Sequence, residues 1–362
     1  MAVFTQIDNP ELFFQTVLWN GNSSTQSITL GGSENMQPDF VWAKARTGTD
    51  PVYNHALYNS VIGATKTLRT NNGTYERTLT AGLTSFDSNG FSLGDDGHTN
   101  LNGNTNVGWC WKAGTSFSND ASSTGVGSID SSGSVNDTAG FSITSYTGTG
   151  TAGTIKHGLS TAPQLLIVKM RSQSDGDGAT MDWSVFHPGL GSNDYRIRFN
   201  STDTHNDDST YWNSTAPTSS VFSVGTDNSV NQSGKTYICY AFSEKQGYSR
   251  ISSYIGNGAD SGNGPFVYLG FKPAFFLLKE SSNADNWIIM DNKRLGYNPR
   301  NDHLFPNLNV AEYATDRIHL HSTGIKIIDS DGSINTNGAT YIYYAFAEAP
   351  FVNSKGVPST AR

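Results

Sequence analysis

The chain has 362 residues, of which 15% are charged and 12% aromatic, with 38 glycines and a formal net charge of -8 at pH 7. This acidic balance argues against a nucleic acid as the main partner, because phosphate binding needs a basic surface. No apolar run approaches the roughly 20 residues of a membrane-spanning helix. The first residues also lack the basic and apolar regions of a signal peptide, so we expect a soluble protein made in a cytoplasm, with no membrane insertion.

The most informative feature is a pattern that occurs three times. Each copy begins with an aromatic-x-Gly turn, continues with a proline that opens an apolar strand ending in lysine, and closes with an aromatic strand. The turns begin at Trp19, Tyr146 and Tyr254, the proline-to-lysine strands span 38–44, 163–169 and 273–279, and the closing strands span 107–111, 238–242 and 342–346. The period of roughly 100 residues is far longer than that of solenoid repeats, so each copy is predicted to be a domain.

In chain order, the predicted units are an N-terminal arm (1–12), module 1 (13–114), a Ser/Gly-rich linker (115–139), module 2 (140–247), module 3 (248–349) and a C-terminal arm (350–362). The linker has almost no large apolar groups, so it is expected to be flexible, because it buries too little surface to offset its ordering entropy. Modules 2 and 3 follow each other without a spacer. We therefore expect these two to pack rigidly, with module 1 set apart.

Within each copy the signals are those of strands. The apolar runs 165–168 and 275–278, each bounded by proline and lysine, are typical of strands in a sandwich core. Helical periodicity is weak, and only 80–86 and 309–315 are expected to hold a helical turn. The sequence thus predicts an all-β fold of three tandem antiparallel β-sandwich modules with minor helical turns.

Aromatic residues at matching positions favour core packing. Trp183 and Trp287 match each other, while module 1 has His55 at that place, a change that packing tolerates better than catalysis does. The tryptophans found in single copies are the candidates for ligand contacts: Trp19, Trp109, Trp111 and Trp212. Trp19, Trp212 and Tyr297 are the residues predicted to bind a ligand. Cys110 is interpreted as a small buried hydrophobe, and no disulfide with Cys239 is expected.

Carboxylates recur before each closing strand. Asp96, Asp227 and Asp331 are each followed four residues later by an asparagine. One interpretation is an Asx turn that holds the loop; the other is a calcium site, because oxygen ligands in a Gly-rich loop suit a hard cation. Asp329, Asp331 and Asn335 form the best candidate Ca²⁺ set, although the glutamate that ends an EF-hand loop is missing. No other cofactor is expected.

Catalytic motifs are not found. The chain has no Gly-x-Ser-x-Gly elbow and no Gly-rich phosphate loop ending in Lys-Ser or Lys-Thr. His319 and His321 alternate along one strand, as metal ligands or as solvent-facing side chains. A pair of facing carboxylates for glycoside hydrolysis is recognised only in three dimensions, so this alternative stays open. We expect a protein that is not an enzyme.

Several longer motifs span residues 37–42, 63–66, 83–91, 109–114, 154–159 and 341–348. With these motifs the chain resembles the tail fibre-like virion proteins of phages that infect marine bacteria and cyanobacteria. This resemblance covers nearly the whole chain outside 115–139. It implies lectin-like or jelly-roll-like β-sandwich modules and supplies no catalytic residue.

These observations together predict a non-enzymatic phage virion protein, a tail fibre or receptor-contacting component on the tail or particle surface. Its expected partners are other virion proteins, further copies of itself (a trimer being favoured) and a host surface glycan or protein receptor. The alternatives are a capsid or head decoration without a receptor and, less favoured, a polysaccharide depolymerase. Phe4 and Ile7 of the N-terminal arm are predicted to dock on a neighbouring subunit. The partner is expected where the copies differ: at His55, in 171–182 and in 292–316.

Overall fold

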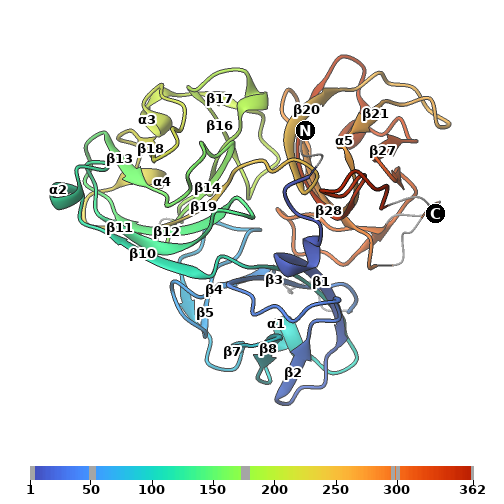
Figure 1. The fold of residues 1–362 in the computed structure, drawn as a ribbon, viewed down its shortest axis with the longest axis horizontal. Helices are drawn as coiled ribbons and strands as arrows, with labels where there is room; N and C mark the ends of the chain where they lie inside the picture. Colours follow the sequence, from blue (N-terminus) through green and yellow to red (C-terminus); the bar gives the residue numbers. More distant parts are fainter. Residues whose placement is uncertain (1–4, 49–53, 173–179, 295–297, 299–301, 360–362) are drawn as a thin grey trace.

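The computed structural model describes residues 5–48, 54–172, 180–294, 298 and 302–359, and it confirms an all-β fold. Three modules surround a common centre (Figure 1). Each module has a large antiparallel sheet next to the centre and a smaller sheet farther out. Short helical turns join the strands. Within the described ranges, no helix has the length and apolar character that crossing a membrane requires.

Module 1 contains a four-stranded sheet in the order β1-β9-β3-β4 and a three-stranded sheet in the order β2-β8-β7. The bounds are β1 (Phe14–Asn20), β2 (Gln26–Thr29), β3 (Phe40–Ala45), β4 (Ala56–Asn59), β7 (Leu83–Asp87), β8 (Gly90–Leu93) and β9 (Thr105–Trp111). A further hairpin and two helical turns are β5 (Lys66–Thr67), β6 (Arg77–Thr78), η1 (Pro10–Leu12) and α1 (Gly97–Asn100).

Module 2 contains the longest sheet, in the order β10-β11-β12-β19-β14-β15-β16-β17, and a separate pair β13-β18. The strands are β10 (Thr115–Asn119), β11 (Ser131–Asn136), β12 (Phe141–Thr147), β13 (Gly153–Lys156), β14 (Leu165–Met170), β15 (Ser184–Phe186), β16 (Tyr195–Arg198), β17 (Asn206–Asp207), β18 (Val221–Val224) and β19 (Thr236–Phe242). The helical turns are α2 (Ala121–Thr124), η2 (Pro188–Leu190), α3 (Ser209–Trp212) and α4 (Asn228–Asn231).

Module 3 repeats the plan of module 1, with sheets β20-β28-β22-β23 and β21-β27-β26. The elements are β20 (Ser249–Ile255), β21 (Phe266–Tyr268), β22 (Phe271–Glu280), β23 (Trp287–Asp291), β24 (Asp302–His303), β25 (Tyr313–Ala314), β26 (Ile318–His321), β27 (Gly324–Ile327), α5 (Gly332–Asn335) and β28 (Thr340–Pro350).

The large sheet of each module is buried on both faces. In β28, Ile342, Tyr344 and Phe346 face the centre of the molecule. The residues between them, such as Tyr343 and Ala345, face the small sheet of the same module. Successive side chains of a strand point to opposite faces, so burial of both faces requires a continuous apolar run. This accounts for the apolar strands between proline and lysine.

Aromatic rings from all three modules form one shared core at the centre. The ring of Trp111, in module 1, lies 4.9 Å from Phe14 and 5.3 Å from Phe40 between centroids. It also lies 6.5 Å from Phe242 of module 2 and 5.5 Å from Phe275 of module 3. Tilted and edge-on pairs at these separations are favourable beyond the area that they bury. The expectation that module 1 stands apart is therefore wrong, because its large sheet forms one wall of this core.

The segment 115–139 is not a flexible linker. It forms β10, α2 and β11, and β11 pairs with β12 over its whole length, Ser131 opposite Tyr146 through Asn136 opposite Phe141. Few large apolar side chains are needed here, because a strand added at a sheet edge is held by backbone hydrogen bonds. Module 2 therefore begins at residue 115. The helical turns expected at 80–86 and 309–315 are also wrong, since β7 and β25 lie there.

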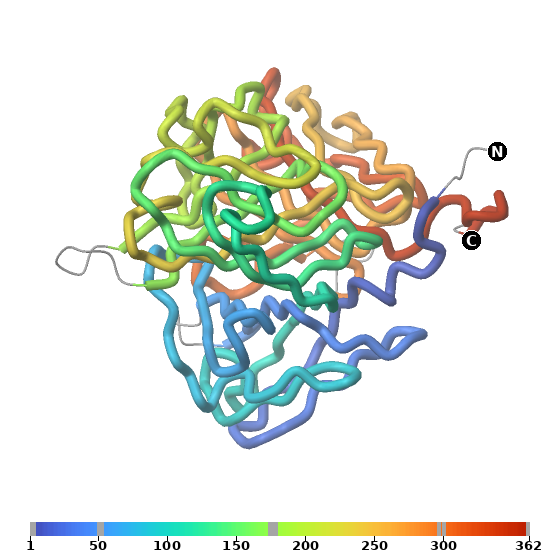
Figure 2. Tube along the Cα trace, turned by 60° about the vertical axis from the view of Figure 1, so that its left-hand side comes forward, coloured from blue at the N-terminus to red at the C-terminus, as the bar shows by residue number. Residues whose placement is uncertain are grey.

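The N-terminal arm packs against its own chain. Ile7 is 3% exposed and belongs to the shared core. The Thr5 hydroxyl donates to the carbonyl of Gln246, and the Asp8 carboxylate accepts from the Ser354 amide at 2.7 Å. The N-terminal and C-terminal arms therefore lie side by side (Figure 2). The prediction that Ile7 docks on a neighbouring subunit is therefore wrong, because its side chain is buried in the core of its own chain. Phe4 lies outside the described residues.

Candidate functional site

The matching positions of the repeat join the modules to one another. His55, Trp183 and Trp287 stand at the start of the equivalent strands β4, β15 and β23, and each ring N–H donates to a backbone carbonyl of another module. The three bonds are His55 Nε2 to Phe305 O at 2.9 Å, Trp287 Nε1 to Arg198 O at 2.9 Å and Trp183 Nε1 to Arg69 O at 2.8 Å. They run from module 1 to 3, from 3 to 2 and from 2 to 1. The modules are thus bonded in a closed ring.

His55 makes the same bond as the tryptophans because a second residue fixes its tautomer. Trp42 Nε1 donates to His55 Nδ1 at 2.9 Å, so Nε2 carries the proton that goes to Phe305. Burial holds the pKa of His55 well below its ordinary value, which keeps the ring neutral. The difference between the copies at this position is therefore structural, and it does not mark a partner site.

Replacing His55 with phenylalanine should lower the free energy of unfolding by about 2–4 kcal/mol, since Trp42 Nε1 and Phe305 O both lose a buried partner. Urea unfolding measures the change. The double variant Trp42→Phe/His55→Phe should lose less than the two single variants together, because both substitutions remove one shared bond. Additive losses would contradict the hydrogen-bonded pair.

The lysines that end the repeated strands are also buried. Lys44, Lys169 and Lys279 are at most 1% exposed, and each ammonium donates to the carbonyl of the following residue. Lys169 also donates to Gly73 of module 1, at 3.2 Å. Burial lowers the pKa of Lys44 and Lys279 to about 8 and that of Lys169 to about 7.

Stability should therefore rise as pH increases from about 7 to 9.5, because the unfolded chain then holds lysine protons that the folded chain has released. Each lysine contributes up to about 1.4 kcal/mol per pH unit between its folded and unfolded pKa values. Denaturant unfolding across this range gives the slope. Lys169→Met should flatten it, whereas substitution of the exposed Lys355 should leave it unchanged. If Lys169→Met and the wild type showed the same change of stability with pH, the Lys169 amine would not be a source of the pH dependence.

The repeated Asp and Asn hold the turn of each module, as the Asx interpretation predicts. Asp96, Asp227 and Asp331 are the N-caps of α1, α4 and α5, with the side chain accepting from the amide two residues on. The Asn four residues later is fully buried and bonds the opposite loop; Asn231, for example, accepts from Thr149 N and donates to Thr151 O. The loops approach so closely that a Cβ at Gly148 would lie 2.4 Å from Gln232 O. Only glycine fits the repeated aromatic-x-Gly turn.

The geometry does not support the predicted calcium set. Both parts of the Asn335 amide are bonded to backbone, its oxygen to Asn257 N and its nitrogen to Ala259 O. Asp331 forms an ion pair with Arg317. Burial alone would raise the pKa of Asp331, but hydrogen bonds from Arg317 and Ser333 lower it to about 2. Asp329 accepts from the Asp331 amide. The Arg317 guanidinium already pairs with the Asp331 carboxylate that a calcium ion would need as a ligand.

The predicted ligand-binding tryptophans are core residues. Trp19 is 8% exposed and donates to Thr99 O at 2.9 Å, while Trp212 is 1% exposed against Phe186. Trp109 and Trp111 are buried in the shared core. None can stack on an external ligand, and Tyr297 lies outside the described residues. His319 and His321 lie 6.3 Å apart between ring centroids, and the described ranges hold no group of three or more His, Cys, Asp or Glu suited to a metal. Cys110 and Cys239 are buried free thiols, as expected.

A charged cluster closes the interface between modules 1 and 3. Asp291, at the end of β23, accepts from Trp109 Nε1 at 3.0 Å and from Arg294 Nε at 2.7 Å. Arg294 also donates to Glu312 at 2.9 Å, and Arg46 of module 1 binds the same carboxylate through two nitrogens. Burial alone would raise the pKa of Asp291, but the charge of Arg294 and these hydrogen bonds hold it below its ordinary value.

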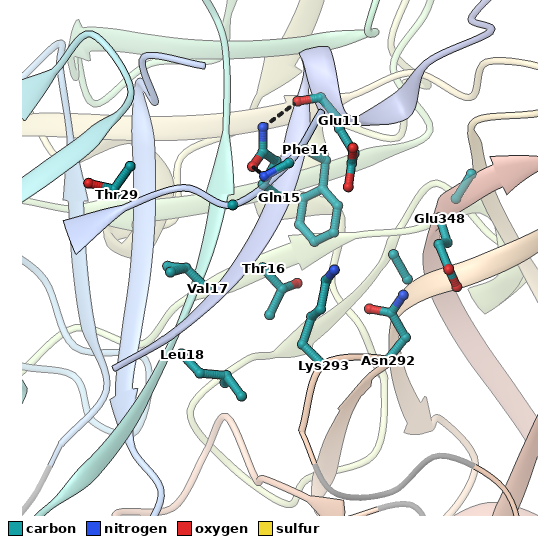
Figure 3. A pocket seen from close by; sticks show the side chains of 14 residues that line it. Glu11, Phe14, Gln15, Thr16, Val17, Leu18, Thr29, Asn292, Lys293 and Glu348 are labelled. Atoms are coloured by element: carbon teal, nitrogen blue, oxygen red, sulfur yellow. Dashed lines mark hydrogen bonds between the residues drawn. The ribbon is translucent and has the colours of Figure 1, made fainter. Parts of the chain in front are cut away.

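Beside this cluster lies a cavity of about 370 Å³ that the sequence did not predict (Figure 3). One wall is β1, and the other comes from module 3 through Ala274, Asn292, Lys293, Ala347 and Glu348. Thr16 and Asn292 are 9% and 7% exposed, and the Thr16 hydroxyl and the Asn292 amide oxygen have no hydrogen-bond partner in the described chain. The signal in the sequence is the pair of polar residues, Gln15 and Thr16, among the apolar residues that precede Asn20 in β1.

Comparison with known families gives one match. A family model described as a domain of unknown function, DUF7483, matches residues 9–350. No curated protein matches the sequence. The matched range covers all three modules and includes the strands β10 and β11.

Proposed function

Because the chain belongs to the DUF7483 family, whose function is unknown, we propose from its own features that it is a non-enzymatic structural protein of a phage particle, a tail fibre or receptor-contacting component. The phage assignment rests on the motifs that resemble virion proteins. The contacting role rests on where exposed aromatic rings lie. This role includes assembly with other virion proteins and with further copies of the chain.

The supporting observation is the one-sided distribution of exposed aromatic side chains. Four such rings are found among the described residues, namely Phe266, Tyr268, Tyr313 and Phe351, and all belong to module 3 or the arm that follows it. Tyr268 is 64% exposed and Phe266 46%, two residues apart on β21 at the edge of the outer sheet. Aromatic rings supply large contact areas and are enriched at interfaces. Module 3 is therefore the proposed contact surface for a host glycan or protein receptor.

The rest of the fold suits a rigid adhesive body. The shared core and the ring of hydrogen bonds hold module 3 on two other modules, so its loops and rings are presented without freedom between modules. A preorganised surface loses less entropy on binding than a flexible one does. Repeated copies on a particle would add avidity.

Binding of the purified, labelled chain to host cells tests the proposal. Tyr268→Ala should reduce binding at least tenfold, while Ile255→Ala, which removes an aliphatic side chain of similar exposure (56%), should change it little. Failure of the wild-type chain both to bind hosts and to inhibit infection would refute the receptor role. Electron microscopy with an antibody against the chain would then show whether it decorates a capsid. Degradation of host polysaccharide by the purified chain would instead indicate an enzyme.

A further inference from the structure

Three equivalent strands lie next to the closing strands of the three large sheets. β1, β12 and β20 pair with β9, β19 and β28, and the equivalent pairs are Phe14 with Trp111, Phe141 with Phe242 and Ser249 with Phe346. Each of these strands has one side on its sheet and one side facing away. The outward sides of these three strands can therefore be compared with one another.

In an antiparallel pair, the backbone N–H and C=O groups of successive residues point alternately toward the partner strand and away from it. This alternation shows which residues direct their backbone groups outward. Lys112 N donates to Phe13 O, which makes Gln15 and Val17 the residues bonded to β9. The N–H and C=O groups of Phe14, Thr16 and Leu18 therefore point away from the sheet. In module 2, Ser243 N donates to Gly140 O, so the groups of Phe141, Ile143 and Ser145 point outward in the same way.

The edge of β12 is paired by another strand of the chain, and the edge of β20 is partly capped. In module 2, β11 pairs along β12. In module 3, the outward amide of Ser249 donates to Lys245 O at 2.9 Å and that of Ile251 donates to the Glu244 carboxylate at 3.2 Å. In module 1, the outward groups of Phe14, Thr16 and Leu18 have no partner in the described chain. Unpaired edges of this kind accept further strands.

The uncovered edge lies inside the cavity between modules 1 and 3. Figure 3 shows Thr16, Lys293 and Asn292 along this cavity. The unpartnered hydroxyl of Thr16 comes from β1 itself, and the unpartnered amide oxygen of Asn292 comes from the facing module. A buried polar atom without a partner is costly, so the site is more stable when a ligand supplies hydrogen bonds. Lys293, at the mouth, is exposed.

We propose that this cavity binds an extended polypeptide segment with small polar side chains, which adds to β1 as a fifth, antiparallel strand of the module 1 sheet. The chain contains its own example of such a segment. The strand on the equivalent edge, β11, has the sequence Ser-Ser-Gly-Ser-Val-Asn and places Asn136, Ser134 and Ser132 opposite Phe141, Ile143 and Ser145. Main-chain bonds supply the affinity in this mode of recognition, and small side chains fit the narrow space beside Ala274 and Ala347.

A sugar fits these observations less well. Among the described residues, the only aromatic one that lines the cavity is Phe14, which is 3% exposed and has its ring stacked on Phe346 at 5.1 Å. The described lining therefore leaves no ring face for a sugar to stack on. A row of outward backbone groups, in contrast, matches the spacing of another strand. This inference does not depend on the proposed role in receptor contact.

The test uses a synthetic peptide with the sequence of residues 130–137, titrated into the isotope-labelled full chain and followed by amide chemical shifts. Binding should be saturable, with Kd in the high micromolar to millimolar range, and the outward amides of Phe14, Thr16 and Leu18 should shift most. A peptide carrying the change Ser134→Pro, which removes an N–H directed at β1, should bind at least tenfold more weakly. The Val135→Pro peptide loses an N–H on the other side and is the matched control, because Val135 pairs with Ser142 and its N–H points away from β12.

Two protein variants complete the test. Thr16→Pro removes an outward N–H without removing a bond to β9, and it should weaken the peptide at least tenfold. Asn292→Leu, outside β1, should weaken it severalfold and serves if Thr16→Pro does not fold. Absence of shifts at millimolar peptide, shifts centred on another edge, or equal binding of both proline peptides would overturn the proposal. So would shifts at the cavity produced by N-acetylglucosamine and not by the peptide.

Discussion

Replacing Trp111 with alanine should destabilise all three modules together, by about 3–5 kcal/mol, the usual loss when a buried aromatic side chain is truncated. The reason is its place in the shared core, where its ring contacts Phe242 of module 2 and Phe275 of module 3. Calorimetry should still show one cooperative transition, shifted to lower temperature. A transition that splits, with one part unchanged, would mean that the modules fold independently.

The reactivity of the two native cysteines reports on whether modules 1 and 2 open together. Cys110 lies in module 1 and Cys239 in module 2, both fully buried, and burial raises the pKa of each thiol. Each reacts with a thiol reagent only when its module opens. In Trp111→Ala both should react faster by similar factors. Phe91→Ala truncates a ring within the separate core of module 1 and is the control, with Cys110 expected to respond more than Cys239.

Replacing Asp291 with asparagine should cost about 3–5 kcal/mol, because it leaves the Arg294 guanidinium without one carboxylate in a site where both side chains are at most 1% exposed. Thermal unfolding of the variant measures the loss. The paired variant Asp291→Leu/Arg294→Met removes both charges and should recover most of it. A double variant as unstable as Asp291→Asn would show that the remaining contacts of the cluster, and not the unpaired charge, set the cost.

Asp291 also predicts how the protein responds to acid. Its pKa is lower in the folded chain than in the unfolded chain, so its contribution is complete above the unfolded value of about 3.9 and is lost as pH falls through the folded value. The stability of the wild type should therefore fall more steeply below about pH 4 than that of Asp291→Asn. Unfolding measured across this range checks the difference. Parallel curves would assign the acid sensitivity to other carboxylates.

The strands and their threefold repetition could be predicted because both depend on short-range features of the sequence. The spacing from Pro163 to Lys169 recurs without change, and the caps at Asp96, Asp227 and Asp331 are local turns. The large sheets were recognisable because burial of both faces makes their strands continuously apolar. The sequence did not reveal that the second face is covered by the other two modules of the same chain.

The site was harder to predict for two physical reasons. Trp19 and Trp212 occur in only one copy each, and nothing in that pattern distinguishes an exposed ring from one that fills a gap in its own module. The segment 115–139 is poor in apolar residues, yet it forms strands because its backbone hydrogen-bonds to the edge of β12. Composition alone does not show that a sheet edge lies within reach. The cavity depends on the distance between Thr16 and Asn292, which are separated by most of the chain. The order of segment 115–139 depends on backbone pairing, and the cavity depends on contact between distant segments, so neither follows from local sequence.

Bonds that run from module 1 to 3, from 3 to 2 and from 2 to 1 also make each module depend on the other two. An open stack of repeats can gain or lose a unit, because each unit contacts only its neighbours. A module of a closed cycle contacts both of the others, so loss of one copy would break two of the three bonds and expose the central aromatic rings to water. Variation should therefore be confined to loops and edges, where changes leave the cycle intact.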